Sequence, residues 1–389
     1  MKTKDITKEL YFKRMKETTK EIYNRLVKEI DKKYKDKDIK KEIMILTKRR
    51  SNKLLSRPFI LRMGYEVAGG TNWKETTSLG ILLELENIST YQSNAVFDDK
   101  YGLADTTLSK INQTISSFLT RNLIQDIIDK EIATKYGSDN ARKISQAITN
   151  IDVSNYTGQF IEINSLSVNN FNLNMSLREY LKLYLRVKYL YGGVWIKECL
   201  NSGVIIANKG NIGELDILKK FGELCGTPYT IINDISDFCI MNVERGFKVS
   251  IQDQFKDVWN GRITLPLYYA LSKYSKATQK EKNFLRNALN GKEKKTIINM
   301  KKILKILIRS NALNYSYSIM NYLRRKAKLK LKELPKSKER DFILMLNSAI
   351  RTNKFVSELR KQGMKLIDLD SETISFLDDF DKNVINMRG

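Results

Sequence analysis

Asn and Asp side chains recur at a helical spacing near the end of one apolar segment. The segment FGELCGTPYTIINDISDF, residues 221–238, contains Asn233, Asp234 and Asp237. Asn233 and Asp237 are four residues apart, so their oxygen atoms would share one helix face. Mg²⁺ takes oxygen ligands, and waters and substrate phosphates complete its shell. The spacing indicates a magnesium site or, alternatively, the ordinary polar end of a helix.

A second segment repeats this pattern. The segment LLELENISTYQSNAVFDDKYG, residues 82–102, places Asn94 and Asp98 four residues apart after another apolar run. If the two predicted helices meet in a bundle, their oxygen atoms surround one cavity and hold metal ions against a diphosphate. The alternative is that Asp98 begins a solvated loop.

A third segment combines a cation with the start of a helix. In FKDVWNGRITLPLYYAL, residues 255–271, Arg262 follows a glycine and precedes Pro266. Proline is favoured in the first turn of a helix, and a helix N-terminus attracts anions. Arg262 at this place favours phosphate binding, and the alternative is a plain junction between a loop and a helix.

Composition excludes several other kinds of chemistry. The 389 residues include no histidine, which excludes His general bases, Ser-His-Asp triads and His metal ligands. The three cysteines form no C-x-x-C pair, so we expect neither a disulfide framework nor a zinc site. The first residues lack the apolar core of a signal peptide, and no apolar run is long enough to cross a membrane. We therefore expect a cytoplasmic protein.

The chain carries a formal net charge of +25. This excess indicates polyanionic partners, such as diphosphates, nucleic acid or an anionic membrane surface. A lysine-rich surface that is merely solvated explains the same charge. No motif combines aromatic and basic residues for base recognition, so nucleic acid is not an expected partner.

Apolar residues at helical spacing predict an all-α protein. We expect a basic helical N-terminal extension over residues 1–45, one all-α domain over 46–355, and a C-terminal tail or capping helix over 356–389. Within the domain, the expected helices are 58–70, 75–97, 105–136, 139–149, 176–208, 212–232, 262–273, 279–289, 294–309, 311–334 and 338–353.

These segments, in this order, resemble the trans-isoprenyl (polyprenyl) diphosphate synthase family. GELCGTPYTIINDISDF resembles the second Asp-rich helix of that family, and GRITLPLYYAL resembles its G-K-x-T-L-P-L segment. SRPFILRMGYEVAGG, TGQFIEI and REYLKLYLRVKYLYGG resemble its L-R-P, G-Q-x-x-D and E-Y-x-x-x-x-x-x-K-T segments, and residues 312–335 resemble its late helix ending in L-P. The resemblance covers residues 46–355 and implies an isoprenoid-synthase-type helical bundle with a central cavity.

The resemblance also implies a prenyltransferase that ionises an allylic prenyl diphosphate with Mg²⁺ and condenses it with isopentenyl diphosphate. In such an enzyme the protein stabilises charge and excludes water from a carbocation. By the matching positions, the catalytic residues would be Asp98, Asp234 and Lys188. The substrate-binding residues would be Lys53, Arg57, Asn87, Gln159, Lys188 and Arg262. The metal ligands would be Asn94, Asp98, Asn233, Asp234 and Asp237.

The chain departs from the family pattern at several of these positions. Asn94 and Asn233 stand where the family has Asp, and Leu103-Ala104 stand where it has Arg-Arg. Neutral ligands weaken metal binding, and the missing cations bear mostly on isopentenyl diphosphate. Three functions stay open: chain elongation, prenyl transfer to another acceptor such as a peptide (or terpene cyclisation), and a non-catalytic subunit of a heteromeric synthase.

The resemblance extends to partners. Members of the family usually form helical dimers, so it implies a homodimer or a heteromer with a homologous subunit. The basic extension over residues 1–45 offers a peripheral contact with a membrane that holds lipid product, or it packs on the fold. The product chain length and the prenyl acceptor stay open.

Overall fold

In the computed structural model the chain is all-α, as predicted. The structure describes residues 3–51, 56–97, 110–172, 174–207, 212–240, 254–351 and 354–386. Within these ranges there is no β-strand, and the isolated bridge between Ser167 and Arg262 is the sheet-like pairing that the structure records. Lys53 and Asp98, both expected in the site, lie outside the described residues.

The internal contacts of the chain divide it into two compact units, and each is described by itself. The first unit comprises the described parts of Met1–Asn155, Trp195–Gly222 and Lys330–Leu346. The second comprises those of Tyr156–Val194, Glu223–Leu329 and Asn347–Gly389. Helices that contribute residues to both units are α7 (Ser138–Ser165), α9 (Val194–Ala207), α10 (Ile212–Asp237), α15 (Ala312–Leu331) and α16 (Lys338–Arg351).

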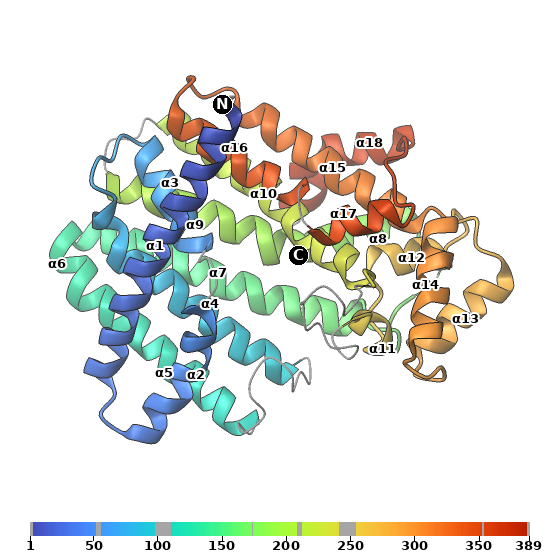
Figure 1. Cartoon of the computed structure of the whole chain (residues 1–389), viewed down its shortest axis with the longest axis horizontal. Coiled ribbons are helices and arrows are strands. Elements are labelled where there is room, and N and C mark those ends of the chain that lie inside the picture. Colours follow the sequence, from blue (N-terminus) through green and yellow to red (C-terminus); the bar gives the residue numbers. More distant parts are fainter. Residues whose placement is uncertain are drawn as a thin grey trace. The chain divides into compact units, whose positions relative to one another are not determined.

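The first unit is built mainly from the N-terminal helices (Figure 1). They are α1 (Thr3–Lys33), α2 (Lys37–Ser51), α3 (Ser56–Val67), η1 (Trp73–Thr76), α4 (Thr77–Phe97), α5 (Lys110–Ile127), η2 (Ile128–Ile132) and α6 (Ala133–Tyr136). α4 packs along α5, where the Ser117 hydroxyl oxygen lies 2.9 Å from those of Ser89 and Ser93.

Helix α1 supplies part of the core of the first unit. Tyr11 packs edge-on against Phe59 of α3, with ring centroids 5.1 Å apart, and Arg14 pairs with Glu66 of α3 at 2.6 Å. Its buried apolar stripe, spaced by one or two helical turns, consists of Tyr11, Met15, Ile22, Leu26 and Ile30. The helical pattern expected within residues 1–45 thus corresponds to a helix packed inside this unit.

The second unit holds the remaining helices. They are α8 (Leu177–Lys188), η3 (Tyr189–Gly193), α11 (Lys256–Trp259), α12 (Leu265–Leu271), α13 (Gln279–Leu289), α14 (Ile297–Arg309), α17 (Lys354–Lys361), α18 (Ser371–Asp378) and η6 (Asp381–Ile385). α12 contacts α8, α13 and α14, and the latter two are visible beside it in Figure 1. The Thr-Leu-Pro segment begins α12, with Thr264 as N-cap and Pro266 in the first turn.

The C-terminal residues form helices, which was one of the two expected alternatives. Phe376, Phe380 and Val384 are buried. The Arg186 guanidinium of α8 donates to the carbonyl oxygens of Val384 and Ile385 at 3.1 and 2.8 Å. These contacts fix η6 against α8.

The largest difference from the expected helix boundaries lies in α7. The periodicity predicts a helix over 139–149, whereas α7 continues to Ser165. It passes through Gly158, a residue that usually weakens a helix interior. Gly158 lies against the ring of Tyr191, where an added Cβ would come within 2.9 Å of the ring edge. Packing therefore outweighs the intrinsic preference of glycine at this point.

None of the described helices is both long enough and apolar enough to cross a bilayer.

Candidate functional site

Helix α8 presents Lys188 to the interior of the second unit. The helix begins with a capping box, in which Ser176 and Glu179 each accept a hydrogen bond from the backbone N–H of the other. Tyr180, Tyr184 and Lys188 follow at intervals of four residues, so they share the buried face. Lys188 is only 4% exposed, and a buried ammonium requires partners.

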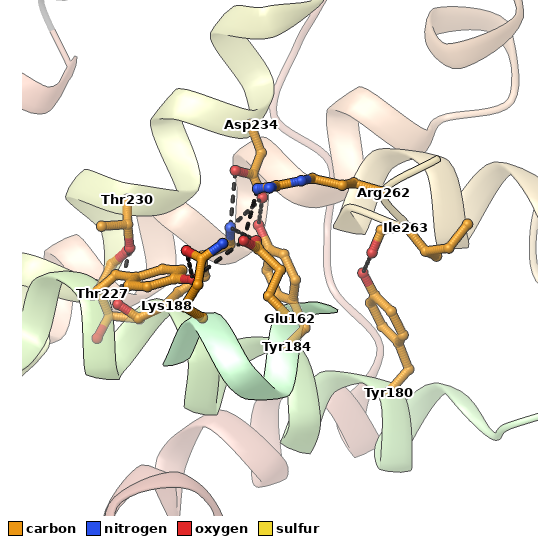
Figure 2. A network of polar contacts seen from close by, with 11 residues as sticks. Glu162, Tyr180, Tyr184, Lys188, Thr227, Thr230, Asp234, Arg262 and Ile263 are labelled. Carbon is orange, nitrogen blue, oxygen red and sulfur yellow. Dashed lines mark hydrogen bonds and ion pairs between the residues drawn. The ribbon is translucent and has the colours of Figure 1, made fainter. Parts of the chain in front are cut away.

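The partners of Lys188 are two carboxylates. Its Nζ lies 3.0 and 2.9 Å from the two carboxylate oxygens of Asp234 on α10, and 3.6 Å from Glu162 Oε1 on α7. The Tyr184 hydroxyl donates to Asp234 Oδ2 at 2.7 Å. Figure 2 shows Lys188, Glu162, Asp234 and Arg262 directed towards one another. We call these four residues the Lys188 network.

Arg262 completes the network from the loop before α12. Its Nη1 lies 2.8 Å from Glu162 Oε2. The Tyr191 hydroxyl donates to Gln159 Oε1 at 2.9 Å and to Glu162 Oε2 at 3.2 Å. Gln159, predicted to bind substrate, is thus joined to the network through Tyr191.

Backbone geometry fixes the position of Arg262. Gly261 has a φ of +64°, which glycine adopts without strain, and its carbonyl accepts the N–H of Val168 at 2.7 Å. The N–H of Arg262 donates to the carbonyl of Asp257 at 2.8 Å. Gly261 therefore forms the turn that directs the Arg262 side chain towards Glu162.

Two glycines bring the Lys188 helix and the Asp234 helix together. Gly192 in η3 and Gly226 in α10 touch through their backbones, and a Cβ on either would overlap the other. The element η3 is a π-helical turn directly after Lys188, and such turns often occur at functional sites. The Thr230 hydroxyl donates to the carbonyl of Lys188 at 2.9 Å (Figure 2).

Burial and charge act in opposite directions on the network. Burial alone would lower the pKa of Lys188, but the negative charges of Asp234 and Glu162 outweigh it and raise that pKa above its ordinary value. Burial raises the pKa of Glu162, against the opposing charge of Lys188. The two cations and two carboxylates of the Lys188 network balance in formal charge.

Asp237 is held by backbone donors. Its two carboxylate oxygens accept the N–H groups of Lys256 and Asp257 at 3.2 and 3.0 Å. Phe255 enters this turn with a φ of +52° and donates its N–H to the Asp237 carbonyl at 2.9 Å. Burial and the neighbouring Asp257 carboxylate raise the pKa of Asp237 well above its ordinary value.

A stack of tyrosines lies beside the network. The rings of Tyr180 and Tyr268 are parallel, with centroids 3.7 Å apart, and the Tyr180 hydroxyl donates to the Ile263 carbonyl at 2.8 Å. Both side chains are almost completely buried. This stack joins α8 to α12, the helix that follows Arg262 in the sequence.

The second Asp-rich segment offers side-chain oxygens, which are the ligands that suit Mg²⁺. Asp234 and Asp237 retain acceptor capacity beyond the hydrogen bonds described, and Asn233 is exposed. The donors do not complete a metal site by themselves, because no group of three or more Cys, Asp or Glu side chains in the described ranges is arranged to hold an ion.

Three further sequence-predicted residues lie in the first unit. The Arg57 guanidinium stacks 4.3 Å from the ring centroid of Trp195. Asn87 of α4 is buried, and its Nδ2 has no hydrogen-bond partner among the described residues. Asn94, one turn before the end of α4, is partly exposed.

The structure adds residues that the sequence reasoning did not single out. Glu162 lies three residues after Gln159 in the TGQFIEI segment, and this acidic side chain at helical spacing was an available signal. Tyr184 and Tyr191 lie in the REYLKLYLRVKYLYGG segment, where nothing in the sequence marks them as partners of carboxylates. Asp257 carries no sequence signal, because its role depends on the turn that follows Asp237.

Solved structures share this fold. Geranylgeranyl pyrophosphate synthetase from Pyrococcus horikoshii aligns with a TM-score of 0.70 at 16% identity, covering 89% of this chain and 99% of that one. A Caulobacter crescentus polyprenyl synthase, complexed with calcium and isoprenyl diphosphate, aligns with a TM-score of 0.69 at 17% identity, covering 88% and 98%. Heptaprenyl diphosphate synthase from Staphylococcus aureus aligns with a TM-score of 0.65 at 19% identity, covering 87% and 98%.

No protein of curated function matches the chain in sequence. A family model, described as polyprenyl synthetase, matches residues 106–307, slightly more than half of the chain. That range contains all four members of the Lys188 network. The fold and the sequence model agree, and the chain therefore belongs to the polyprenyl synthetase family.

Proposed function

We propose that the chain is a prenyltransferase of the trans-isoprenyl diphosphate synthase type, and that its Lys188 network receives the diphosphate of an allylic prenyl diphosphate. Family and fold point to prenyltransferase chemistry. The observation that carries the proposal is the buried Lys188 ammonium, held by Asp234 and Glu162 beside Arg262. Ammonium and guanidinium groups are the usual binding partners of phosphate oxygens.

The charge balance of the network bears on how a diphosphate would enter. Because Lys188 and Arg262 are already matched by two carboxylates, they exert little net attraction on a further anion. Additional positive charge is needed, and we propose Mg²⁺ as its source. The Asn233, Asp234 and Asp237 side chains of α10 would help to hold it, and its positive charge would neutralise the leaving group.

The residues of the chain perform the remaining tasks in the proposed reaction. The bond between the allylic carbon and the diphosphate oxygen breaks, and its electron pair stays on the diphosphate, which Lys188 and Arg262 stabilise. The double bond of isopentenyl diphosphate attacks the allylic carbocation, and the transfer of a proton from the new cation to an oxygen of the released diphosphate restores a double bond. Tyr184 and Tyr191 hold the carboxylates that orient the two cations.

A turnover assay tests this proposal. Purified protein with Mg²⁺, geranyl or farnesyl diphosphate and labelled isopentenyl diphosphate should give a longer prenyl diphosphate. Lys188→Met should abolish the product, whereas Lys182→Met, an exposed change on the same helix, should leave it unchanged. Diphosphate release from the allylic substrate alone would indicate another acceptor or cyclisation. No turnover of any allylic substrate by the chain alone would contradict the proposal.

A second candidate function is a non-catalytic subunit of a heteromeric prenyl synthase. The replacement of Asp by Asn at positions 94 and 233 favours it, because neutral amides hold Mg²⁺ less strongly than carboxylates. In this case activity should appear only when a co-encoded homologue is added, and it should survive Lys188→Met in this chain.

The assembly and the cellular location are also proposals. We propose a homodimer, or a heteromer with a homologous subunit, located in the cytoplasm and touching a membrane peripherally. Light scattering of the purified chain, alone and with a homologous subunit, measures the assembly.

A further inference from the structure

A cavity of about 740 Å³ lies in the second unit, and none of the residues of the Lys188 network lines it. It is lined by side chains of α15, of α17 and of the loop that follows α17. Its volume is within the range of small-molecule sites. We call it the α15–α17 cavity.

The lining of this cavity is strongly cationic. Arg324 and Arg325 contribute from α15, Arg360 and Lys361 from α17, and Lys365 from the loop. No carboxylate lines the cavity in the described part of the chain. Lys361 lies 3.4 Å from a Glu358 oxygen at the surface. Like charges gathered in one concave surface create a positive potential that attracts anions.

At least three of these cations have no internal counter-charge. Arg325, Arg360 and Lys365 form no ion pair with another residue that the structure describes. All three are exposed, so the fold does not need a counter-charge for them. Their charge is therefore available to a ligand.

The loop that closes the cavity is held in place by α15. Gly363 has a φ of +111°, and Met364 N–H donates to the Leu359 carbonyl at 2.9 Å, which ends α17 with a glycine cap. Asn314 Oδ1 accepts the Lys365 N–H at 2.9 Å. The Ser318 hydroxyl bonds both the N–H and the carbonyl of Ile367, each at 2.9 Å.

The base of the cavity combines polar and apolar surface. Asn321 Oδ1 accepts from Arg324 Nη2 at 3.0 Å, which orients that guanidinium. Tyr317 and Met364 are each 2% exposed, whereas Leu366 is 52% exposed. A ligand with an anionic head and an apolar portion would contact both kinds of surface.

We propose that the α15–α17 cavity binds the phosphate or diphosphate group of an amphiphile. Arginine forks match phosphate oxygens in paired hydrogen bonds, and lysines add point charges. The ligand has two possible sources: a free prenyl diphosphate in solution, or the headgroup of an anionic lipid in a membrane. The proposal goes beyond the function assigned to the Lys188 network and uses none of its residues.

Calorimetric titration with inorganic diphosphate and with geranyl diphosphate, in EDTA and low salt, tests the soluble source. Arg360→Gln/Lys365→Gln removes two cations from the cavity, and Lys301→Gln/Lys305→Gln removes two exposed cations from α14 as the matched control. We expect the cavity variant to bind roughly tenfold more weakly than the control. A Lys188→Met background separates the two sites, since cavity binding should persist there.

Vesicle flotation tests the membrane source with the same proteins. Vesicles of phosphatidylglycerol should bind the control and should not bind the cavity variant. They should also bind more of the control than vesicles of phosphatidylcholine do. A loss in the titration alone assigns the ligand to solution, and a loss in flotation alone assigns it to the membrane. If the cavity variant equals the control in both measurements, the proposal is overturned, whatever the result of the turnover assay.

Discussion

The Lys188 network and the α15–α17 cavity both gather cations within the second unit, but they treat those charges differently. Lys188 is buried and Arg262 is partly buried, and carboxylates of the same chain lie against both. Arg325, Arg360 and Lys365 are exposed and face no carboxylate of the cavity lining. One region satisfies its charges internally, and the other leaves them for a partner.

Desolvation explains this difference. A buried charge is costly unless an opposite charge and hydrogen bonds compensate it. Lys188 and Asp234 must therefore be buried in contact with each other. An exposed charge keeps its hydration, and so cations are tolerated at the surface without counter-ions. We therefore expect the network to contribute to stability and function together, and the cavity to contribute to binding alone.

The largest expected effect comes from Lys188→Met. Removing one partner leaves buried carboxylates uncompensated, so the free energy of unfolding should fall by about 3–5 kcal/mol. Urea unfolding measures this change. The double variant Lys188→Met/Asp234→Asn should regain most of the stability without regaining turnover. A double variant as unstable as the single one would mean that Asp234 does not depend on Lys188.

The next effect is a pH dependence. Burial raises the pKa of Glu162, so the folded state holds its proton more tightly than the unfolded chain. Stability should then fall as pH rises from the ordinary glutamate pKa towards the raised one, by at most about 1.4 kcal/mol per pH unit. Glu162→Gln should reduce this slope in unfolding experiments at about pH 4 to 7. Arg360→Gln/Lys365→Gln is the control, and its slope should equal that of the wild type.

A smaller effect is expected at the support of the cavity loop. Ser318→Ala removes the hydroxyl that bonds both backbone groups of Ile367. We expect a loss of about 1 kcal/mol in unfolding free energy, and severalfold weaker binding of diphosphate to the cavity. Ser275→Ala, which also removes a hydroxyl bonded to backbone, is the control for stability and should not alter that binding. Unaltered cavity binding in Ser318→Ala would show that the loop is not a preorganised part of the site.

The smallest expected effect is on the stability of the cavity variant, and it tests most directly whether the cavity cations differ from those of the Lys188 network. Arg360→Gln/Lys365→Gln should change the free energy of unfolding by no more than about 0.5 kcal/mol, because exposed charges contribute little to folding. Thermal and urea unfolding measure it beside Lys301→Gln/Lys305→Gln. A loss of several kcal/mol would place these cations among the groups that hold the fold together.

The all-α class and the positions of most helices were predictable from apolar periodicity. The expected 279–289 coincides with α13, and the expected 338–353 begins at Lys338, as α16 does. Thr278 caps α13 locally, so the start of this helix depends on neighbouring residues alone. The end of α7 was not predictable in this way, because the contact of Gly158 with Tyr191 is made by distant parts of the chain.

The candidate site was predictable at Lys188, Asp234 and Arg262, because these residues lie in segments that resemble those of the family. The structure brings these three together, and their roles in catalysis stay a proposal. Glu162 was not predicted as their common neighbour, because the expected helix stopped before it. The cavity was not predictable either, since Arg324 and Lys365 are ordinary members of a lysine-rich chain until folding makes them neighbours.

The backbone contact between Gly192 and Gly226 has a consequence for how the site can change. Because main chain meets main chain there, no change of rotamer can alter the spacing between η3, which follows Lys188, and α10, which carries Asp234. Widening that spacing would require the displacement of an entire helix. A change of specificity that depends on this spacing would therefore have to begin at Gly192 and Gly226, which have no side chain to shorten.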